Sequence, residues 1–320
     1  MEHFEGELGR MLLARSDVDR AGERREDADW QAAAWLDVRT RVFNVYDSRA
    51  EAVMQPAAGL VFHSGPEMDE RHPGADRYFL GVAGDGTAYY AVSAPVAAPV
   101  AEAGTEAGTA EAGTEGSSLR HLRDIAGILS DRDGGLLAHA VGLDHWHRSH
   151  LFCGTCGRPT AITHSGSVRR CTGCGLEHFQ RTDPAVIMAV TDPEDRLLLA
   201  RNASWPQNRA SVLAGFVETG ETLERAVARE VAEEAGLTVT SVRYLGSQPW
   251  PLPRSLMLGF TATVTDADLH LDGAELDWAK WYTRAGLKAD VASGELLMLP
   301  AEISISRRLI NHWYGSNPAD

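Results

Sequence analysis

All four cysteines of the chain lie in a short central segment and form two C-x-x-C pairs. The pairs are Cys153–Cys156 and Cys171–Cys174, in the pattern C-x2-C-x14-C-x2-C. Two thiolates three positions apart can bind one ion from a tight turn, which the neighbouring glycines permit. Two such turns complete a tetrahedral Zn²⁺ site that leaves no position for a substrate. The spacing therefore predicts a structural zinc ribbon.

Basic side chains near the cysteines leave a second use of the ribbon open. Arg158, Arg169 and Arg170 would favour contact with nucleic acid. The whole chain opposes such contact, because 30 Lys and Arg against 45 Asp and Glu give a formal net charge of −15. A general nucleic-acid coat and a polybasic membrane binder are therefore excluded, whereas a local basic groove is not.

Four histidines precede the ribbon, at positions His139, His145, His147 and His150. Imidazole is a common metal ligand, so these residues could indicate another metal site. A polar helix face explains them equally well, and four thiols already lie next to them in the sequence. We therefore favour the polar helix face.

A second cluster of candidate ligands consists of Glu230, Glu233 and Glu234, within the segment GFVETGETLERAVAREVAEEAGL at residues 215–237. At about 100° per helical residue, the three carboxylates share a wedge of about 100° on one helix face. Such crowding of like charges destabilises a bare helix, and Mg²⁺ or Mn²⁺, which prefer oxygen ligands, would relieve it. The alternative is a solvated acidic face.

The segment around these glutamates resembles the Nudix box. Gly215, Glu221 and the run REVAEEAGL at residues 229–237 match its defining positions without a gap. Nudix hydrolases use divalent metal ions to cleave nucleoside diphosphates linked to another moiety, and the resemblance implies this activity here. By the same resemblance, Arg229 pairs with Glu221 and braces the loop.

The resemblance also implies which residues bind the catalytic metal ions. Glu230, Glu234 and the backbone carbonyl of Ala214 would bind them, together with Glu275 further along the chain. Glu233 would assist catalysis or bind another ion. The proton acceptor for the attacking water is expected to be Glu233 or Glu234.

A proline-rich stretch follows the box, with the sequence SQPWPLPRS at residues 247–255. Its three prolines predict a stiff loop and not a regular central strand. Trp250 offers an aromatic surface, Gln248 and Ser255 offer hydrogen bonds, and Arg254 offers a positive charge. Such a loop could bind a nucleotide, and a rigid loop around a buried tryptophan is the alternative.

This stretch is similar to SQPWPFPxS, the marker of the NADH pyrophosphatase (NudC-type) subfamily of Nudix hydrolases, with Leu252 where phenylalanine is usual. A four-cysteine ribbon directly before the Nudix domain is the layout of the same subfamily. The resemblance covers about residues 120–314 and implies that the stretch contacts substrate. The residues concerned are Gln248, Pro249, Trp250, Pro251, Leu252, Pro253, Arg254 and Ser255.

The subfamily resemblance implies further substrate contacts outside that stretch. Phe216 matches an aromatic residue that stacks on a base or nicotinamide ring, and Phe179 stands where tyrosine is frequent. Ser306 stands at a contact position where alanine is common. Arg123 is the candidate phosphate contact of the N-terminal domain, with the neighbouring Arg120 as the alternative. Core packing is the competing explanation for both aromatic residues.

The implied reaction is hydrolysis of the pyrophosphate of NAD(H) to nicotinamide mononucleotide and AMP, with Mg²⁺ or Mn²⁺ as cofactor. Members of this subfamily are homodimers with shared active sites, and some remove NAD caps from RNA 5′ ends. Two alternatives stay open. One is a Nudix hydrolase of another nucleoside diphosphate derivative such as ADP-ribose. The other is a catalytically silent zinc-ribbon RNA-binding protein, which the complete set of glutamates disfavours.

The residues above are expected to fall into three domains of an α+β chain. Residues 1–145 are expected to form a β-rich domain, with a flexible insertion at 92–118, where EAGT occurs three times. Residues 146–182 would form the ribbon. Residues 183–318 would form a Nudix domain, for which the resemblance implies an α/β/α sandwich with a mixed sheet.

Local signals predict individual elements within these domains. The Asp85-Gly86 pair between two strand-like runs predicts a β-hairpin. The Gly134-Gly135 pair predicts a break between two helical pieces. In the glutamate segment, Thr222 is the expected N-cap of the helix and Gly236 its expected end.

The position of the cysteines also bears on the compartment. In a chain of 320 residues, four cysteines confined to two knuckles indicate a metal site in a reducing compartment and not a disulfide framework. The chain lacks an apolar run long enough to span a bilayer, and its start, MEHFEGELGR, lacks an apolar signal core. We therefore expect a cytoplasmic protein that does not bind membranes.

Overall fold

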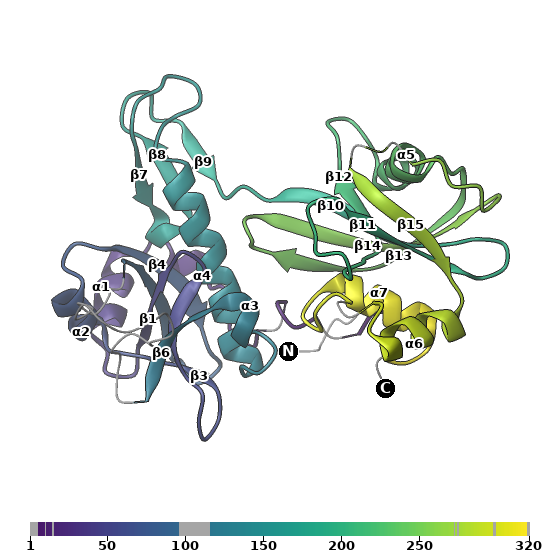
Figure 1. The fold of residues 1–320 in the computed structure, drawn as a ribbon. Coiled ribbons are helices and arrows are strands. Elements are labelled where there is room, and N and C mark those ends of the chain that lie inside the picture. Colours follow the sequence, from purple (N-terminus) through teal and green to yellow (C-terminus); the bar gives the residue numbers. More distant parts are fainter. Residues whose placement is uncertain are drawn as a thin grey trace, which may run out of the picture. The chain divides into compact units, whose positions relative to one another are not determined.

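The chain divides into two compact units, and each is described by itself (Figure 1). The first comprises residues 12–182 together with 250–254, and the second comprises 2–11, 183–249 and 255–320. The structure is a computed structural model. It describes residues 6–9, 11–14, 16–95, 116–271, 273, 275–296 and 299–318.

The first unit is built on a six-stranded sheet of order β3-β2-β1-β5-β4, in which β6 also pairs with β2. Neighbouring strands are antiparallel, except that β1 and β5 run parallel. The strands are β1 (Arg41–Tyr46), β2 (Arg49–Val53), β3 (Gly59–Leu60), β4 (Asp76–Val82), β5 (Ala88–Ser93) and β6 (Ser117–His121). This sheet confirms the expected β-rich character of the N-terminal half.

Two predictions about these strands have different outcomes. The hairpin at Asp85-Gly86 is confirmed, because β4 and β5 pair antiparallel around it and Gly86 adopts a φ of 83°. The predicted insertion at 92–118 is too wide, because β5 extends to Ser93 and β6 begins at Ser117. The EAGT repeats between them lie outside the described residues.

Outside the ribbon, the described helices of the first unit are η1 (Gly22–Arg24), α1 (Ala28–Leu36), α2 (Gly65–Arg71), α3 (Leu122–Ile125) and α4 (Asp131–Ser149). The predicted break at Gly134-Gly135 is wrong, because α4 runs through both residues and buries them. Apolar burial along the helix offsets the low helical propensity of glycine, about 1 kcal/mol per residue. In the described ranges, no helix combines the length and apolar character needed to cross a bilayer.

The ribbon belongs to the first unit and forms a small antiparallel sheet of order β7-β8-β9. Its elements are β7 (Thr160–Thr163), η2 (His164–Gly166), β8 (Val168–Cys171) and β9 (Glu177–Phe179). Gly157 and Gly175 adopt φ values of 71° and 76°, a left-handed conformation that closes each cysteine turn.

The second unit contains a sheet of order β13-β14-β10-β11-β15, in which β12 also pairs with β10. The sheet is mixed, because β10 is parallel to β14 and antiparallel to β11 and β12. Its strands are β10 (Asp183–Thr191), β11 (Leu197–Asn202), β12 (Leu213–Phe216), β13 (Val239–Trp250), β14 (Ser255–Val264) and β15 (Leu276–Tyr282).

Helices cover both faces of this sheet, with α5 (Leu223–Ala235) on one face and α6 (Arg284–Ser293) and α7 (Ile305–Tyr314) on the other (Figure 1). The alternation of side chains along β10 shows why. Val186 and Met188 pack in the core that contains α5, whereas Ile187 packs in the core that contains α7. The predicted α/β/α sandwich with a mixed sheet is confirmed.

The boundaries of α5 are those predicted from its sequence. The hydroxyl of Thr222 accepts a hydrogen bond from the Arg225 amide at 3.4 Å, and Gly236 ends the helix with a φ of 71°. By contrast, the prediction that residues 247–255 form a loop is only partly right. Ser247–Trp250 continue β13, which lies at the edge of the sheet, where proline is tolerated because one side of the strand is unpaired.

Candidate active site

The four cysteines converge as their spacing predicts. Their sulfur atoms all lie within 4.8 Å of one another. Backbone N–H groups of Thr155 and Gly173 point at the sulfurs of Cys153 and Cys171, at 3.4 and 3.3 Å. Such N–H groups, chiefly those of Cys156 and Thr155, lower the pKa of the Cys153 thiol. Against a backbone hydrogen bond from Arg158, the contacts of the Cys156 sulfur with those of Cys171 and Cys174 raise the pKa of Cys156. Because zinc binds thiolates, this arrangement fits a closed structural Zn²⁺ site.

The four histidines before the ribbon lie apart from the converging ligands of the described residues. Within the described residues, none of them belongs to a group of three or more potential ligands with converging donor atoms. The favoured polar face is also wrong for His147, which is 1% exposed. Its Nε2 lies 2.7 Å from the Gly166 carbonyl, and Arg169 Nη1 donates to its Nδ1 at 3.1 Å. This side chain is therefore a buried structural group.

Arg229 lies at the centre of the glutamate cluster in the second unit. Its Nε and Nη2 donate to the two carboxylate oxygens of Glu221, both at 2.9 Å. Nη1 donates to Glu230 at 2.8 Å and to Glu233 at 2.9 Å, and Nη2 also donates to the Phe216 carbonyl at 2.8 Å. The hydrogen bonds from Arg229 lower the pKa of Glu221. One guanidinium thus joins the loop after β12 to α5.

Glu230 lies against the backbone of β12, so closely that a Cβ on Gly215 would overlap its carboxylate. Burial raises the pKa of Glu230, and the neighbouring charges of Glu233 and Glu275 raise it further, although Arg229 opposes both effects. A partly buried carboxylate with other carboxylates nearby is stabilised by a cation. This environment therefore fits the predicted divalent-metal ligand.

The other predicted metal ligands, Ala214, Glu234 and Glu275, lie in the same unit as Glu230. Ala214 is exposed in β12, where it pairs with Ile187 of β10. Glu234 is 8% exposed on α5. Among the described residues, the four sulfurs form a group of three or more potential ligands with converging donor atoms, and the glutamates do not form such a group in the metal-free structure. Oxygen ligands of this kind fit Mg²⁺ or Mn²⁺, which retain water and substrate oxygens among their ligands.

Two of the predicted substrate contacts turn out to be buried and hydrogen-bonded within the protein. Gln248 is fully buried, and its amide donates to the Ile303 carbonyl and accepts from the Ile305 amide, both at 2.7 Å. Ser306 is 3% exposed, with its hydroxyl 2.6 Å from that of Ser211. Both side chains fix the start of α7, and their predicted contact with substrate stays a prediction.

The remaining residues of the proline-rich stretch belong partly to the first unit. Residues 250–254 group with that unit, and the guanidinium of Arg123 lies 5.6 Å from the Trp250 ring centre. The Pro253 carbonyl lies 3.1 Å from His145 Nδ1. Pro251 is buried, whereas Leu252, Arg254 and Ser255 are half-buried, as is Pro249 of the second unit. The structure therefore brings together Arg123 and Trp250, two separately predicted substrate contacts.

The two predicted aromatic contacts are both exposed. Phe216 is 60% exposed at the end of β12, and Phe179 is 69% exposed at the end of β9. Exposure on this scale is unusual for phenylalanine and disfavours core packing as their role. Each ring is available to stack on a ligand.

Comparison with known proteins agrees with these features over most of the chain. A NUDIX domain matches residues 181–300, an NADH pyrophosphatase zinc ribbon domain matches 148–179, and an NADH pyrophosphatase-like rudimentary NUDIX domain matches 9–146. The NAD-capped RNA hydrolase NudC of Mycobacterium bovis is 39% identical over 314 residues, which cover 94% of each chain. The chain belongs to the NADH pyrophosphatase (NudC-type) family of Nudix hydrolases.

Other relatives of this Nudix hydrolase match it over shorter segments. The NAD-capped RNA hydrolase NudC of Deinococcus radiodurans is 41% identical over 199 residues, which cover 61% of this chain and 68% of that protein. A solved Nudix hydrolase from Nitrosomonas europaea is 23% identical and covers 52% of this chain and 93% of its own, with a TM-score of 0.41.

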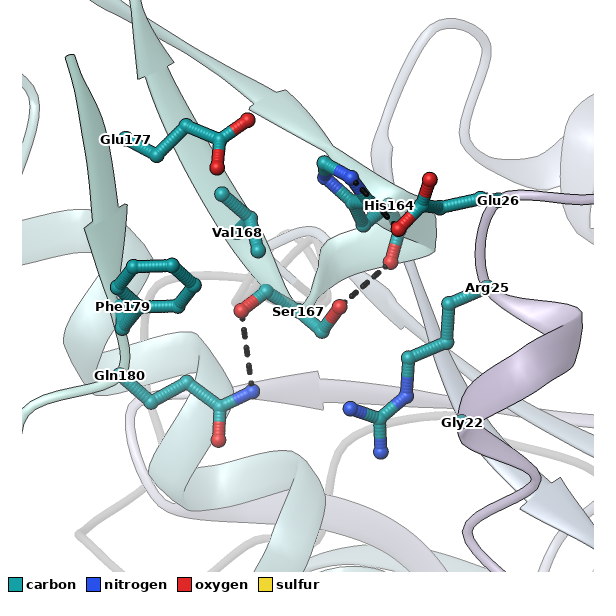
Figure 2. Close-up of a pocket in the computed structure, with 9 residues that line it drawn as sticks. All are labelled: Gly22, Arg25, Glu26, His164, Ser167, Val168, Glu177, Phe179 and Gln180. Carbon is teal, nitrogen blue, oxygen red and sulfur yellow. Dashed lines mark hydrogen bonds and ion pairs between the residues drawn. The ribbon is translucent and has the colours of Figure 1, made fainter.

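One feature of this NudC-type chain was not predicted from its sequence. A cavity of about 450 Å³ lies in the first unit between the segment after Ala21 and the ribbon (Figure 2). It is lined by Gly22, Arg25, Glu26, His164, Ser167, Val168, Glu177, Phe179 and Gln180. Apart from Phe179, these residues belong to none of the motifs found in the sequence. They come from segments that are far apart along the chain, so a local sequence pattern could not indicate the cavity.

Proposed function

We propose that this Nudix hydrolase cleaves the pyrophosphate bond of NAD(H), giving nicotinamide mononucleotide and AMP, and that it also removes NAD caps from RNA 5′ ends. The observation that carries the proposal is the Nudix glutamate cluster held by Arg229, with Glu230 partly buried beside Glu233 and Glu275. The curated NudC relatives, which are NAD-capped RNA hydrolases, support the choice of substrate.

In the proposed mechanism, residues of the second unit bind the metal ions, position a metal ligand and accept a proton. Glu230, Glu234, Glu275 and the Ala214 carbonyl would hold Mg²⁺ or Mn²⁺, which supplies charge neutralisation and an activated water when bound. Arg229 keeps Glu230 against β12. Glu233, which is exposed, is placed to assist or to accept the proton from the attacking water.

We propose that exposed rings provide substrate recognition. Phe216 and Phe179 would each stack on a base or nicotinamide ring, and Trp250 with Arg123 would contact the remainder of the dinucleotide. The family also suggests a homodimer as the working form. The four free cysteines support a reducing compartment such as the cytoplasm.

The experiment that tests this function compares Glu234→Gln with Glu224→Gln, an exposed change on the same helix. Turnover of NADH and of NAD-capped RNA is measured with Mg²⁺ and with Mn²⁺, alongside a thermal melt. Changes next to metal ligands already cost about 10- to 100-fold, so loss of a ligand in Glu234→Gln should lower kcat by at least about 100-fold. Glu224→Gln should behave as wild type.

Two results would contradict the proposal. A near-wild-type kcat in a folded Glu234→Gln variant would contradict the assignment of Glu234 as a ligand of the catalytic metal ion. Faster turnover of ADP-ribose than of NADH or capped RNA would instead assign the same machinery to another nucleoside diphosphate derivative.

A further inference from the structure

Arg201 is a buried cation of the second unit that the proposed mechanism does not use. It lies near the end of β11 and is 4% exposed. A buried charge is costly unless hydrogen bonds and a counter-charge satisfy it. At this exposure the guanidinium does not reach a substrate, so its contacts within the protein determine what it can do.

The guanidinium of Arg201 joins the loop after β11 to the start of β15. Its Nε donates to the Pro206 carbonyl at 2.9 Å, and its Nη2 donates to the carbonyls of Trp205 and, at 3.5 Å, Ala203. Its Nη1 donates to the carboxylate of Asp277 on β15. The fixed fork of N–H donors in arginine suits a side chain that must hold several acceptors at once.

Asp277 occupies a β-bulge in β15. The paired positions on either side of it are Arg201 with Trp278 and Asn202 with Leu276. Asp277 is therefore an extra residue on β15, between two neighbouring pairs. Bulges bend and twist a strand locally, and they are frequent next to active sites, where they change the direction of side chains. Arg201 holds this bulge through the Asp277 carboxylate.

Glu275, a predicted metal ligand, lies two residues before the bulge. Its carbonyl accepts from the Ala203 amide at 3.0 Å, within the loop that Arg201 holds. Its side chain is exposed, and the carboxylates of Glu275 and Glu230 are close enough to interact electrostatically. The backbone of Glu275 is thus fixed on one side by the loop and on the other by the bulge, and Arg201 contacts both.

We infer that Arg201 is a positioning residue of the catalytic metal site, which holds the loop at 203–206 and the bulge at Asp277 so that Glu275 stays beside Glu230. Arg201 acts through Glu275 and touches neither metal ion nor substrate. The inference rests on the proposed function, in which both glutamates bind Mg²⁺ or Mn²⁺. Loss of a group that orients a metal ligand typically weakens metal binding by about 10- to 100-fold.

The test compares Arg201→Gln with Arg209→Gln. Arg209 belongs to the same loop and is half-buried, and its guanidinium lies 4.5 Å from the Trp205 ring centre. Binding of Mn²⁺ is measured by electron paramagnetic resonance without substrate, alongside a thermal melt. Arg201→Gln should weaken Mn²⁺ binding by at least about tenfold, and Arg209→Gln should match wild type.

Coupling to Glu275 separates a positioning role from a merely structural one. If Arg201 acts through Glu275, adding Arg201→Gln to Glu275→Gln should cause no further loss of Mn²⁺ affinity. Losses that multiply in the double variant would overturn the inference. Should Arg201→Gln fail to fold, Asp277→Asn removes the charge of the bulge at a site that is 46% exposed. It should weaken Mn²⁺ binding by about tenfold, and wild-type binding in this variant would overturn the inference.

The same titrations distinguish failure of this inference from failure of the proposed function. Wild-type Mn²⁺ affinity in Glu275→Gln would remove Glu275 from the proposed ligands, and the role of Arg201 would fall with it. Weaker binding in Glu275→Gln together with wild-type binding in a folded Arg201→Gln variant would overturn the inference alone. Weaker binding in both single variants, with no further loss in the double variant, supports it.

Discussion

At the scale of single residues, Arg229 has the most demanding role in the glutamate cluster. A guanidinium carries five N–H donors in a fixed fork. In Arg229 these donors serve two oxygens of Glu221, one each of Glu230 and Glu233, and the Phe216 carbonyl. The same side chain therefore aligns a metal ligand, a candidate base and the loop that carries the Phe216 ring.

We predict that Arg229→Lys lowers kcat/KM on NADH by at least about tenfold, although the charge is kept. An ammonium group has only three donors and cannot hold Glu221 in a bidentate contact while it reaches Glu230 and Glu233. Steady-state kinetics over a series of Mg²⁺ concentrations measure the effect. Arg225→Lys, an exposed change on the same helix, is the control. Equal kinetics in the two variants would mean that Arg229 contributes charge alone.

The sequence predicted one contact of this cluster, but it did not predict the burial of two other site candidates, for a physical reason. The pairing of Arg229 with Glu221 follows from a local motif, and it is present in the structure. Gln248 and Ser306 were assigned to substrate by their positions in motifs, yet both are buried. Their burial depends on the packing of α7 against the sheet, which is a long-range contact that a local motif does not encode.

At the scale of elements, the approach of α5 to β12 determines where Glu230 lies. The strand can approach the helix closely because Gly215 has no side chain, and a Cβ there would overlap the Glu230 carboxylate. We predict that Gly215→Ala folds, because a flexible side chain can move aside, but loses at least about tenfold in kcat with a weaker Mg²⁺ dependence. Kinetics and a thermal melt measure both effects.

The control for this prediction is Gly84→Ala, where an added Cβ meets nothing within 4 Å. Unchanged kcat in Gly215→Ala would show that the enzyme tolerates a displaced Glu230. Unfolding of Gly215→Ala would show that the Glu230 side chain cannot move aside, so that the added methyl group disrupts the packing of β12 against α5. Either result would contradict the proposed role of this close approach.

Elements were predicted well where their signals are local. The helix α5 has its own N-cap and C-terminal glycine, and it begins and ends where these residues predict. The strand β13 retains Pro249 because it lies at the sheet edge, and α4 retains the Gly134-Gly135 pair because its neighbours bury both residues. Edge position and burial are properties of the assembled unit, so the sequence signals at these sites pointed to a loop and to a helix break.

At the scale of the whole molecule, the ribbon is joined to the N-terminal sheet by buried polar groups. The His147 ring stacks on Tyr78 of β4, with ring centres 4.7 Å apart and planes at 16°. Arg169 of β8 donates to His147 and also to the Thr160 side chain and carbonyl, at 2.7 and 2.9 Å. This network requires an unprotonated Nδ1 on His147, since Arg169 is a donor.

The stability of the molecule should therefore depend on pH through His147. Burial lowers its pKa to about 4, below its ordinary value of about 6.5. Between these values the unfolded chain binds one proton more than the folded chain, so the free energy of unfolding falls as the pH decreases from 6.5 to 4. The expected loss is about 3 kcal/mol, with no further loss from this residue below pH 4. Urea unfolding across the pH series measures this loss of stability.

The control is His147→Gln, which keeps a donor for the Gly166 carbonyl but cannot titrate. Its free energy of unfolding should therefore fall less between pH 6.5 and pH 4. Parallel pH profiles for the variant and the wild type would show that His147 is not held neutral by the fold.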